Sequence, residues 1–350
     1  MSYVKPSFRH PDLPHNRIGL TEASYEGAIS TLCAGCGHDS ISAAIVRACW
    51  ELDLPPHRVA KLSGIGCSSK SPTYFLNQAH GFNTVHGRMP SVATGANVAN
   101  RDLVYFGVSG DGDSASIGMG QFAHVVRRNL NMVYVIENNG CYGLTKGQES
   151  ATQDRGSKTR KGSANPFASI DLVGVALQLG ATFVGRSFSG DKNQLVPLIK
   201  AAIKHKGFAL LDVVSPCVTF NNHEGSTKSY DYTRDHIETG VIMDFVPMKD
   251  EIRTSYEPGE TVEVTLHDGS AIHLHKADSS YDATDRQAAI NAVQSHKEDG
   301  KLLTGLIYID PDSEDFHEMM GTSDTPLNQL SKRELSPTAE TLARINQSFC

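Results

Sequence analysis

Acidic and amide side chains that suit a magnesium site follow two apolar runs of this sequence. Asp111 lies in a Gly-Asp-Gly-Asp turn after the run 103–108, and Asn139 follows the run 132–136. If these runs are parallel strands of one sheet, both side chains emerge at the same edge and can reach one ion. The glycines beside Asp111 would let the backbone approach a phosphate, whose oxygens complete the coordination of Mg²⁺. The alternative is that both motifs are ordinary turns.

Four of the seven cysteines could form a second metal site. Cys33 and Cys36 make a C-x₂-C pair, and Cys67 and Cys217 each lie in loop sequence that contains glycine or proline. Four thiolates can hold Zn²⁺ or an iron–sulfur cluster, and structural zinc usually takes two C-x₂-C pairs, of which this chain has one. Cys49 falls on a predicted helix, which favours an ordinary buried thiol. Spacing alone leaves a cluster, zinc and unligated thiols open.

The order of the predicted elements supplies a scaffold that brings strand ends together. Apolar runs typical of buried strands alternate with segments of helical periodicity up to about residue 220. We predict helices over 39–52, 91–100, 116–128, 167–179 and 193–204, and strands over 59–62, 103–108, 132–136, 181–184 and 208–214. Asp39 or Ser40 would cap the first helix. This alternation predicts the α/β class, with a doubly wound, mostly parallel sheet.

The sequence pattern changes after about residue 230. Period-two alternation on both sides of Asp268-Gly269 predicts a hairpin over 261–275, followed by a helix over 284–296 and a strand over 302–309. We therefore divide the chain into three parts. These are an N-terminal arm (1–30), an α/β domain with both candidate sites (31–230), and a small mixed α+β appendage (231–350) that packs on the core or on another subunit.

Composition excludes several classes of function. The 350 residues are 39% hydrophobic and 20% charged, as in ordinary globular proteins. The 32 basic and 39 acidic residues give a net charge of −7 with no basic block, so we expect neither nucleic acid nor an anionic membrane as a partner. The sequence shows no apolar run that could span a bilayer and no secretion signal, which predicts a cytoplasmic protein.

Taken together, the two candidate sites resemble those of a known enzyme family. The matching motifs are CAGCGH (33–38), GIGCSS (64–69), HGR (86–88), GDGD (110–113), NNGCYGLTKGQ (138–148) and SPC (215–217). On these motifs, over roughly residues 30–230, the chain resembles the beta subunits of the 2-oxoacid:ferredoxin oxidoreductases. The segment 217–236 is similar to the 2-oxoglutarate branch rather than the pyruvate branch.

The resemblance implies roles for individual residues. The Mg²⁺ of thiamine diphosphate would be held by Asp111, Asn139 and the backbone carbonyl of Cys141. A [4Fe–4S] cluster would be ligated by Cys33, Cys36, Cys67 and Cys217. Thiamine diphosphate would be lined by Ile65, Gly66, Cys67, Ser68, His86, Gly112, Asp113, Asn139, Gly143 and Leu144.

Three further points concern the substrate and one departure from the family. The resemblance implies that Lys146 faces the 2-oxoacid, whereas the sequence alone favours a solvated loop lysine. His86 and Arg88 could meet the second carboxylate of 2-oxoglutarate or only bond the backbone. Cys141 stands where the family often has a small apolar residue, and this matters little if only its carbonyl is used.

The resemblance also implies an activity and partners. Such an enzyme converts 2-oxoglutarate, coenzyme A and oxidised ferredoxin to succinyl-CoA, CO₂ and reduced ferredoxin, and can run toward CO₂ fixation in the reductive TCA cycle. Thiamine catalysis also needs a glutamate beside the aminopyrimidine ring, and no segment after residue 230 predicts a second α/β half to supply it. We therefore expect a separate alpha subunit, in a heterodimer or a dimer of heterodimers, that also completes the substrate pockets.

Other functions remain open on the sequence. The substrate could be pyruvate or another 2-oxoacid. A non-redox thiamine diphosphate decarboxylase or ligase would carry the same GDG motif, with its cysteines on structural zinc. An electron-transfer or metal-binding module would use the GDGD segment only as a turn, and it would not bind thiamine diphosphate.

Overall fold

One sheet organises the chain, and the computed structural model describes residues 12–157, 164–219, 252–266 and 271–349. Within these residues nine strands form a sheet of order β2-β1-β3-β4-β8-β7-β11-β10-β9. Six neighbouring strands run parallel: β2 (His80–Asn83), β1 (Val59–Ser63), β3 (Val104–Gly110), β4 (Met132–Asn138), β8 (Phe208–Val214) and β7 (Phe183–Phe188). The predicted mostly parallel α/β sheet is therefore confirmed.

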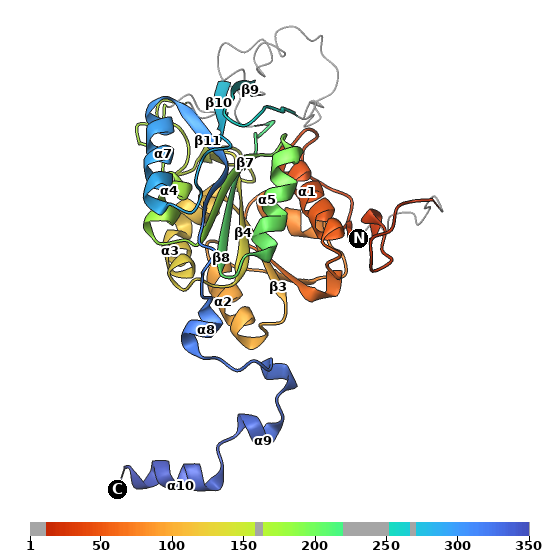
Figure 1. Cartoon of the computed structure of the whole chain (residues 1–350), viewed down its shortest axis with the longest axis vertical. Coiled ribbons are helices and arrows are strands. Elements are labelled where there is room, and N and C mark those ends of the chain that lie inside the picture. The colour runs from red at the N-terminus through yellow and green to blue at the C-terminus, as the bar shows by residue number, and fades with distance from the viewer. Residues whose placement is uncertain (1–11, 158–163, 220–251, 267–270, 350) are drawn as a thin grey trace.

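Helices cover both faces of this sheet, which is why its central strands are continuous apolar runs. One face packs against α1 (Gly37–Glu51) and α5 (Lys192–Lys204). The other packs against α2 (Met89–Ala99), α3 (Met119–Arg127), α4 (Leu172–Gln178) and α7 (Arg286–Glu298). Figure 1 shows the two layers on opposite sides of the strands. Within the second layer the ring of Phe208 meets those of Phe122 and Tyr134 edge to face, and these two rings are tilted against each other, with ring centroids 5.7 to 6.2 Å apart.

Three helix boundaries differ from the prediction. The helix α1 begins at Gly37 with Cys36 at its N-cap and no side-chain cap, so the expected cap at Asp39 or Ser40 is wrong. The helix α4 begins at Leu172 because the Asp171 carboxylate caps it by accepting from the Val173 amide at 3.1 Å. The predicted helix 116–128 is divided into a π-helical turn (Gly112–Ile117) and α3.

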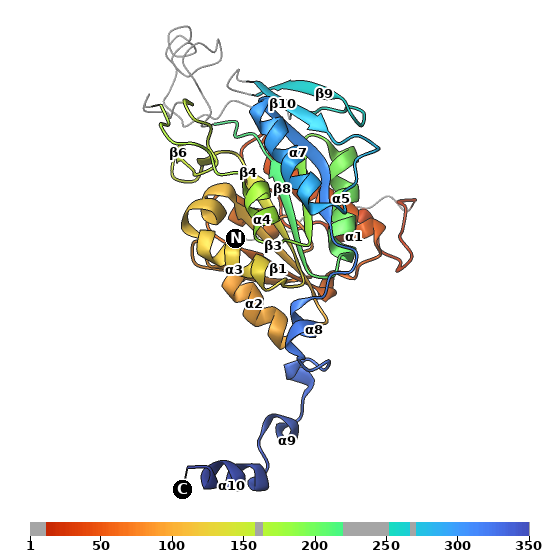
Figure 2. The same ribbon diagram turned by 60° about the vertical axis from the view of Figure 1, so that its left-hand side comes forward.

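The C-terminal strands extend the main sheet. The predicted hairpin is confirmed as antiparallel β9 (Thr261–Thr265) and β10 (Ala271–Lys276), although its turn lies outside the described residues. The strand β11 (Lys301–Ile309) then pairs parallel with β10 and antiparallel with β7. After it, α8 (Phe316–Met320), α9 (Lys332–Leu335) and α10 (Ala339–Gln347) form an arm, and the last two point away from the body in Figures 1 and 2. No helix in the described part of the chain is both long and apolar enough to cross a membrane.

A buried ion group joins two of the parallel strands. Arg186 on β7 donates to the Asp212 carboxylate on β8 at 3.0 Å and to Asp171 at the start of α4. Burial opposes the charge of Asp171, but the Arg186 guanidinium outweighs it and holds the pKa of that carboxyl below its ordinary value. The second Asp212 oxygen accepts from the Asn138 amide at 3.0 Å, so the group reaches the end of β4.

The substitution Arg186→Leu should lower the free energy of unfolding by about 3–5 kcal/mol, because it leaves the buried carboxylate of Asp212 and the half-buried carboxylate of Asp171 without their cation. Urea unfolding measures the loss. Arg47→Ala is the control, since Arg47 pairs with Glu22 and Glu51 at the surface and such pairs contribute about 1 kcal/mol or less. Equal losses in the two variants would contradict the importance of the buried group.

Candidate functional site

The carboxyl ends of four parallel strands bring the sequence motifs to one edge of the sheet. The loops that follow β1, β3, β4 and β8 hold, in this order, Cys67, Asp111, Asn139 and Cys217. In the sheet β1 pairs with β3, β3 with β4, and β4 with β8. Ligands of such folds bind at this edge, beyond the carboxyl ends of the strands. The arrangement therefore places both sets of candidate ligands where the fold binds cofactors.

Asp111 is almost fully buried and is bound by segments that lie far from it in the sequence. The Asn139 amide donates to its Oδ1 at 3.2 Å, and the Thr152 hydroxyl donates to its Oδ2 at 2.6 Å, together with the Ser150 hydroxyl. Burial raises the pKa of Asp111, while these donors lower it. Since two hydroxyl groups occupy Oδ2, Oδ1 is the oxygen with a lone pair left for a cation.

A short hairpin that the sequence analysis missed follows Asn139. The Asn139 side chain accepts from the Cys141 amide at 3.1 Å, and the strand β5 (Cys141–Tyr142) then pairs with β6 (Gln148–Glu149). The Tyr142 hydroxyl donates to the carbonyl of Gly112 at 3.0 Å, and a side chain at Gly112 would overlap the tyrosine ring. Lys146 lies exposed at the tip, with a φ of +79° that L residues rarely adopt.

The Asp113 carboxylate joins three segments of the protein. Its Oδ1 accepts from the amides of Gly87 at 2.7 Å and Ile65 at 3.4 Å, and from the His86 ring, while Oδ2 accepts from the Ser109 hydroxyl at 2.6 Å. The loops after β1 and β2 are thus fixed to the end of β3. Through these hydrogen bonds the Asp113 carboxylate positions both loops.

The four cysteines of the predicted cluster lie in one region. Burial, then the charges of Cys217 and Cys33, raise the pKa of Cys67 to about 11. The charge of Cys217 also raises the pKa of Cys36, and the Thr219 hydroxyl donates to Cys33 Sγ at 3.4 Å. In contrast, Cys49 is completely buried in the core beside α1, which confirms the prediction of an ordinary buried thiol.

The residue types fit the two implied groups, although the geometry is not closed around a metal. Within the described residues, no three His, Cys, Asp or Glu side chains are arranged so that they could hold a metal ion. Burial disfavours free thiolates at these cysteines, and binding to iron would stabilise the thiolate form, so four sulfur donors suit an iron–sulfur cluster. The remaining lone pair of Asp111 and the amide oxygen of Asn139 suit Mg²⁺.

A buried polar group beside the cysteines was not predicted. Glu137, fully buried at the end of β4, accepts from the Ser71 hydroxyl at 2.9 Å, and His38 Nδ1 lies 3.6 Å from the same carboxyl oxygen. Burial raises the pKa of Glu137 well above its ordinary value, and it lowers the pKa of His38 to about 4, so the His38 ring is neutral at pH 7. His38 also bonds the Ser215 hydroxyl at 2.6 Å. The group thus links the segments next to three of the cysteines.

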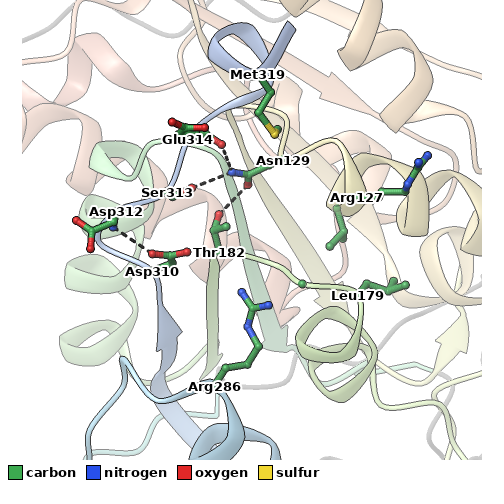
Figure 3. A pocket seen from close by; sticks show the side chains of 12 residues that line it. Arg127, Asn129, Leu179, Thr182, Arg286, Asp310, Asp312, Ser313, Glu314 and Met319 are labelled. Carbon is green, nitrogen blue, oxygen red and sulfur yellow. Dashed lines mark hydrogen bonds between the residues drawn. The ribbon is translucent and has the colours of Figure 1, made fainter.

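The hollow in Figure 3 lies at the opposite edge of the sheet. Its volume is about 450 Å³, and its lining includes Asn129, Thr182 and Arg286. Asn129 precedes β4 and Thr182 precedes β7, so both lie at the amino ends of parallel strands. The Asn129 side chain is used within the protein, since it accepts from the Thr182 hydroxyl at 2.7 Å and donates to Ser313 at 2.8 Å. The hollow is separate from the candidate ligands.

Comparison with known proteins identifies the family. Residues 64–213 match the family model described as "Thiamine pyrophosphate enzyme, C-terminal TPP binding domain". The 2-oxoacid:ferredoxin oxidoreductase subunit beta of Saccharolobus solfataricus is 43% identical over 199 residues, which cover 57% of this chain and 65% of that relative. The 2-oxoglutarate synthase subunit KorB of Methanocaldococcus jannaschii is 39% identical over 192 residues, or 54% of this chain and 69% of the relative. The chain belongs to the beta-subunit family of the 2-oxoacid:ferredoxin oxidoreductases.

A solved structure confirms the fold of this beta-subunit family member. The 2-oxoglutarate:ferredoxin oxidoreductase from Magnetococcus marinus, solved with 2-oxoglutarate, coenzyme A and succinyl-CoA bound, superposes with a TM-score of 0.69 at 29% identity. The match covers 93% of this chain and 97% of that one. The predicted thiamine diphosphate-binding α/β fold is thus confirmed. By sequence, this chain spans 63% to 65% of the length of three beta-subunit relatives.

In this beta-subunit family member, Asp113→Ala should speed hydrogen exchange at the Ile65 and Gly87 amides by about tenfold to a hundredfold. The reason is that each amide loses a charged acceptor, an interaction of about 1.5–3 kcal/mol. Exchange measured by mass spectrometry tests this, with the surface substitution Asp102→Ala as the control. Unchanged exchange at both amides would show that other contacts hold the loops.

Proposed function

We propose that this chain is the thiamine diphosphate- and [4Fe–4S]-containing beta subunit of an oxidoreductase. The enzyme reversibly converts 2-oxoglutarate, coenzyme A and oxidised ferredoxin to succinyl-CoA, CO₂ and reduced ferredoxin. The observation that carries the proposal is that two ligand sets lie at one edge of the sheet. The oxygen ligands follow β3 and β4, and the cysteines follow β1 and β8 or precede α1. The Magnetococcus marinus enzyme, solved with 2-oxoglutarate and succinyl-CoA, supports the choice of substrate.

Asp111, Asn139 and the Cys141 carbonyl would hold the Mg²⁺ of thiamine diphosphate. When bound, this coenzyme supplies the carbanion that adds to the keto carbon and the electron sink that accepts the electron pair as CO₂ leaves. Asp111 would bind the cation through Oδ1, because Ser150 and Thr152 occupy Oδ2. The coenzyme would be lined by residues from the loops after β1, β2, β3 and β4: Ile65, Gly66, Cys67, Ser68, His86, Gly112, Asp113, Asn139, Gly143 and Leu144.

Cys33, Cys36, Cys67 and Cys217 would ligate the [4Fe–4S] cluster, which supplies a one-electron acceptor next to the coenzyme. Their partial burial limits access of water to the cluster. His38, whose pKa burial lowers to about 4, adds no charge beside it at pH 7. Electrons would leave this region one at a time toward ferredoxin.

Lys146 would face the 2-oxoacid. Its left-handed backbone is strained for a side chain other than glycine, and such strain is found disproportionately at functional positions. Its cationic side chain is of the right charge for a carboxylate. Ser150 follows the second strand of the hairpin and donates to Asp111. The proposed substrate-facing residue, Lys146, therefore lies four residues before a residue that binds the proposed magnesium ligand.

The partner subunit is part of the proposal. An alpha subunit would supply the glutamate for the aminopyrimidine ring and complete the pockets for the 2-oxoacid and coenzyme A. Within the predicted appendage 231–350, the strands β9, β10 and β11 pack on the core, and the arm of α8, α9 and α10 would pack against the alpha subunit or against another copy of the chain. Exposed apolar side chains on the arm agree with such packing, among them Leu335, Leu342, Ile345 and Phe349.

The activity test uses the full chain produced together with its alpha subunit. Reduction of ferredoxin in the presence of coenzyme A should be faster with 2-oxoglutarate than with pyruvate, and the chain alone should be inactive. Lys146→Gln should raise the KM for 2-oxoglutarate about tenfold, equivalent to about 1.4 kcal/mol of lost charge pairing, with Lys70→Gln as the control. Faster ferredoxin reduction with pyruvate would refute the assignment of 2-oxoglutarate as the substrate. Full activity of the isolated chain would refute the proposal that the alpha subunit completes the active site.

The cluster has its own test. Anaerobically purified wild-type chain should contain iron and acid-labile sulfide in equal amounts, and Cys33→Ser should lose most of both because a thiolate ligand is removed. Cys49→Ser is the matched control, as this thiol is buried in the core and should leave the iron content unchanged. Stoichiometric zinc without sulfide in the wild type would overturn the redox assignment in favour of a non-redox thiamine enzyme.

A further inference from the structure

A groove between α1 and the N-terminal arm is not used by the function proposed above. Its volume is about 340 Å³. Residues between 22 and 30 form one wall, together with Tyr74. The other wall is a single face of α1, because its members lie three or four residues apart along the helix: Asp39, Ser42, Ala43 and Val46. At 1.5 Å per residue this helical wall is about 10 Å long, so the groove suits an elongated ligand.

Backbone hydrogen bonds fix the wall that the N-terminal arm contributes. The Gly27 and Ala28 amides donate to the carbonyls of Tyr74 and Thr73 at 2.8 Å and 2.9 Å. The Tyr74 hydroxyl in turn accepts from the Thr31 amide at 3.1 Å. The N-terminal arm is thus joined to the segment that precedes β2, and the fold itself sets both walls of the groove.

Every charged side chain among the described residues that line the groove is a carboxylate, and a surface of one sign attracts ligands of the opposite charge. Asp39 lies at one end of the helical wall. Glu22 lies close to the other end, where Arg47 donates to it at 3.0 Å and balances part of its charge. Glu26 adds a third carboxylate from the N-terminal arm. Because no three His, Cys, Asp or Glu side chains in the described part of the chain are arranged to hold a metal ion, the groove favours an organic cation.

Ser42 gives an independent indication of a ligand. It is 4% exposed, and its hydroxyl has no hydrogen-bond partner among the described residues. A serine within a helix often bonds a carbonyl of the preceding turn, and a buried hydroxyl without any partner is unfavourable. Since Ser42 lies between Asp39 and Val46 on the helical wall, the missing partner is an N–H group placed part-way along the groove.

The remaining lining suits a hydrocarbon chain. It consists mainly of small apolar side chains: Ala23, Ala28, Ala43 and Val46. Sites for small molecules commonly combine such apolar surface with a few polar groups that fix the orientation of the ligand. Methylene groups would therefore lie between the carboxylates of the two walls.

We propose that this groove binds a linear aliphatic polyamine, a molecule in which ammonium groups alternate with short methylene chains. Its ammonium groups pair with Asp39 and with Glu26 on the opposite wall, and an inner N–H group bonds Ser42. The ligand thus connects the N-terminal arm with α1 and stabilises the folded chain by mass action. The proposed function uses none of these side chains, so the inference does not depend on it.

The test is a calorimetric titration with spermidine, at low ionic strength, of the full chain produced together with its alpha subunit. Binding should saturate at a single site on each chain, and added salt should weaken it because salt screens charge pairs. Asp39→Asn and Ala43→Lys should each weaken binding by about fivefold or more, since the first removes a carboxylate and the second places a competing ammonium group in the groove. Ala43→Lys is sufficient if Asp39→Asn does not fold.

The matched control is Asp312→Asn, which makes the same change of charge beside the hollow of Figure 3 and should leave the affinity unchanged. Butylamine, with a single ammonium group, should bind more weakly than spermidine.

Three outcomes would overturn the inference. The first is an absence of saturable spermidine binding. The second is an equal affinity in the wild type and the groove variants, or an equal loss in Asp312→Asn, which would reduce the effect to net charge. The third is binding by the isolated chain that disappears with the alpha subunit present, because the partner would then cover the groove. Ferredoxin reduction with 2-oxoglutarate is measured separately, so the proposed function would stand in all three cases.

Discussion

The parallel pairing of β3, β4 and β8 is the constraint on which the site depends. Parallel strands end at the same edge, so loops from distant parts of the sequence meet there without long connections. Asp111 and Asn139 become neighbours for this reason, and the Asn139 amide bonds the Asp111 carboxylate. The same pairing brings the segments that hold Cys141 and Cys217 out of the sheet side by side. If the register of β8 against β4 shifted, the segment that holds Cys217 would move away from the loop after β4.

Buried polar contacts fix the side chains that the strands bring together. A continuous series runs from Arg186 through Asp212, Asn138 and Thr152 to the Asp111 carboxylate. In proteins that bind metals, partners of this kind orient the ligands and tune their affinity. The Thr152 hydroxyl has one proton and two acceptors within reach, so it connects the ion group inside the sheet with the proposed magnesium ligand.

The elements that the sequence predicts well are those whose burial is uniform. Strands 103–108, 132–136 and 208–214 were predicted because both of their faces are covered, which requires continuous apolar runs. The strand β2 was not predicted because all four of its positions are exposed. The β5–β6 hairpin was not predicted because each of its strands has only two residues. Periodicity carries no signal for either element.

The candidate site was predicted only as far as its ligand types. Glu137 and Arg186 gave no sequence signal, because a single charged residue within a buried strand has no pattern until its partners are known. Asp113 was expected beside the coenzyme on the basis of its motif, and the structure adds that its hydrogen bonds hold two loops at the end of β3. Motifs identify which residues lie near a site, but the structure is needed to show which atoms of those residues make which contacts.

The contacts of Asp113 have a consequence for how a ligand enters. Since two loops are already fixed to the end of β3 by one carboxylate, an incoming molecule meets a surface whose backbone conformation is set before contact. Little chain entropy is then lost on association, and more of the interaction energy remains as affinity. In this respect the molecule is preorganised: its rigidity resides in a side chain that need not touch the ligand at all.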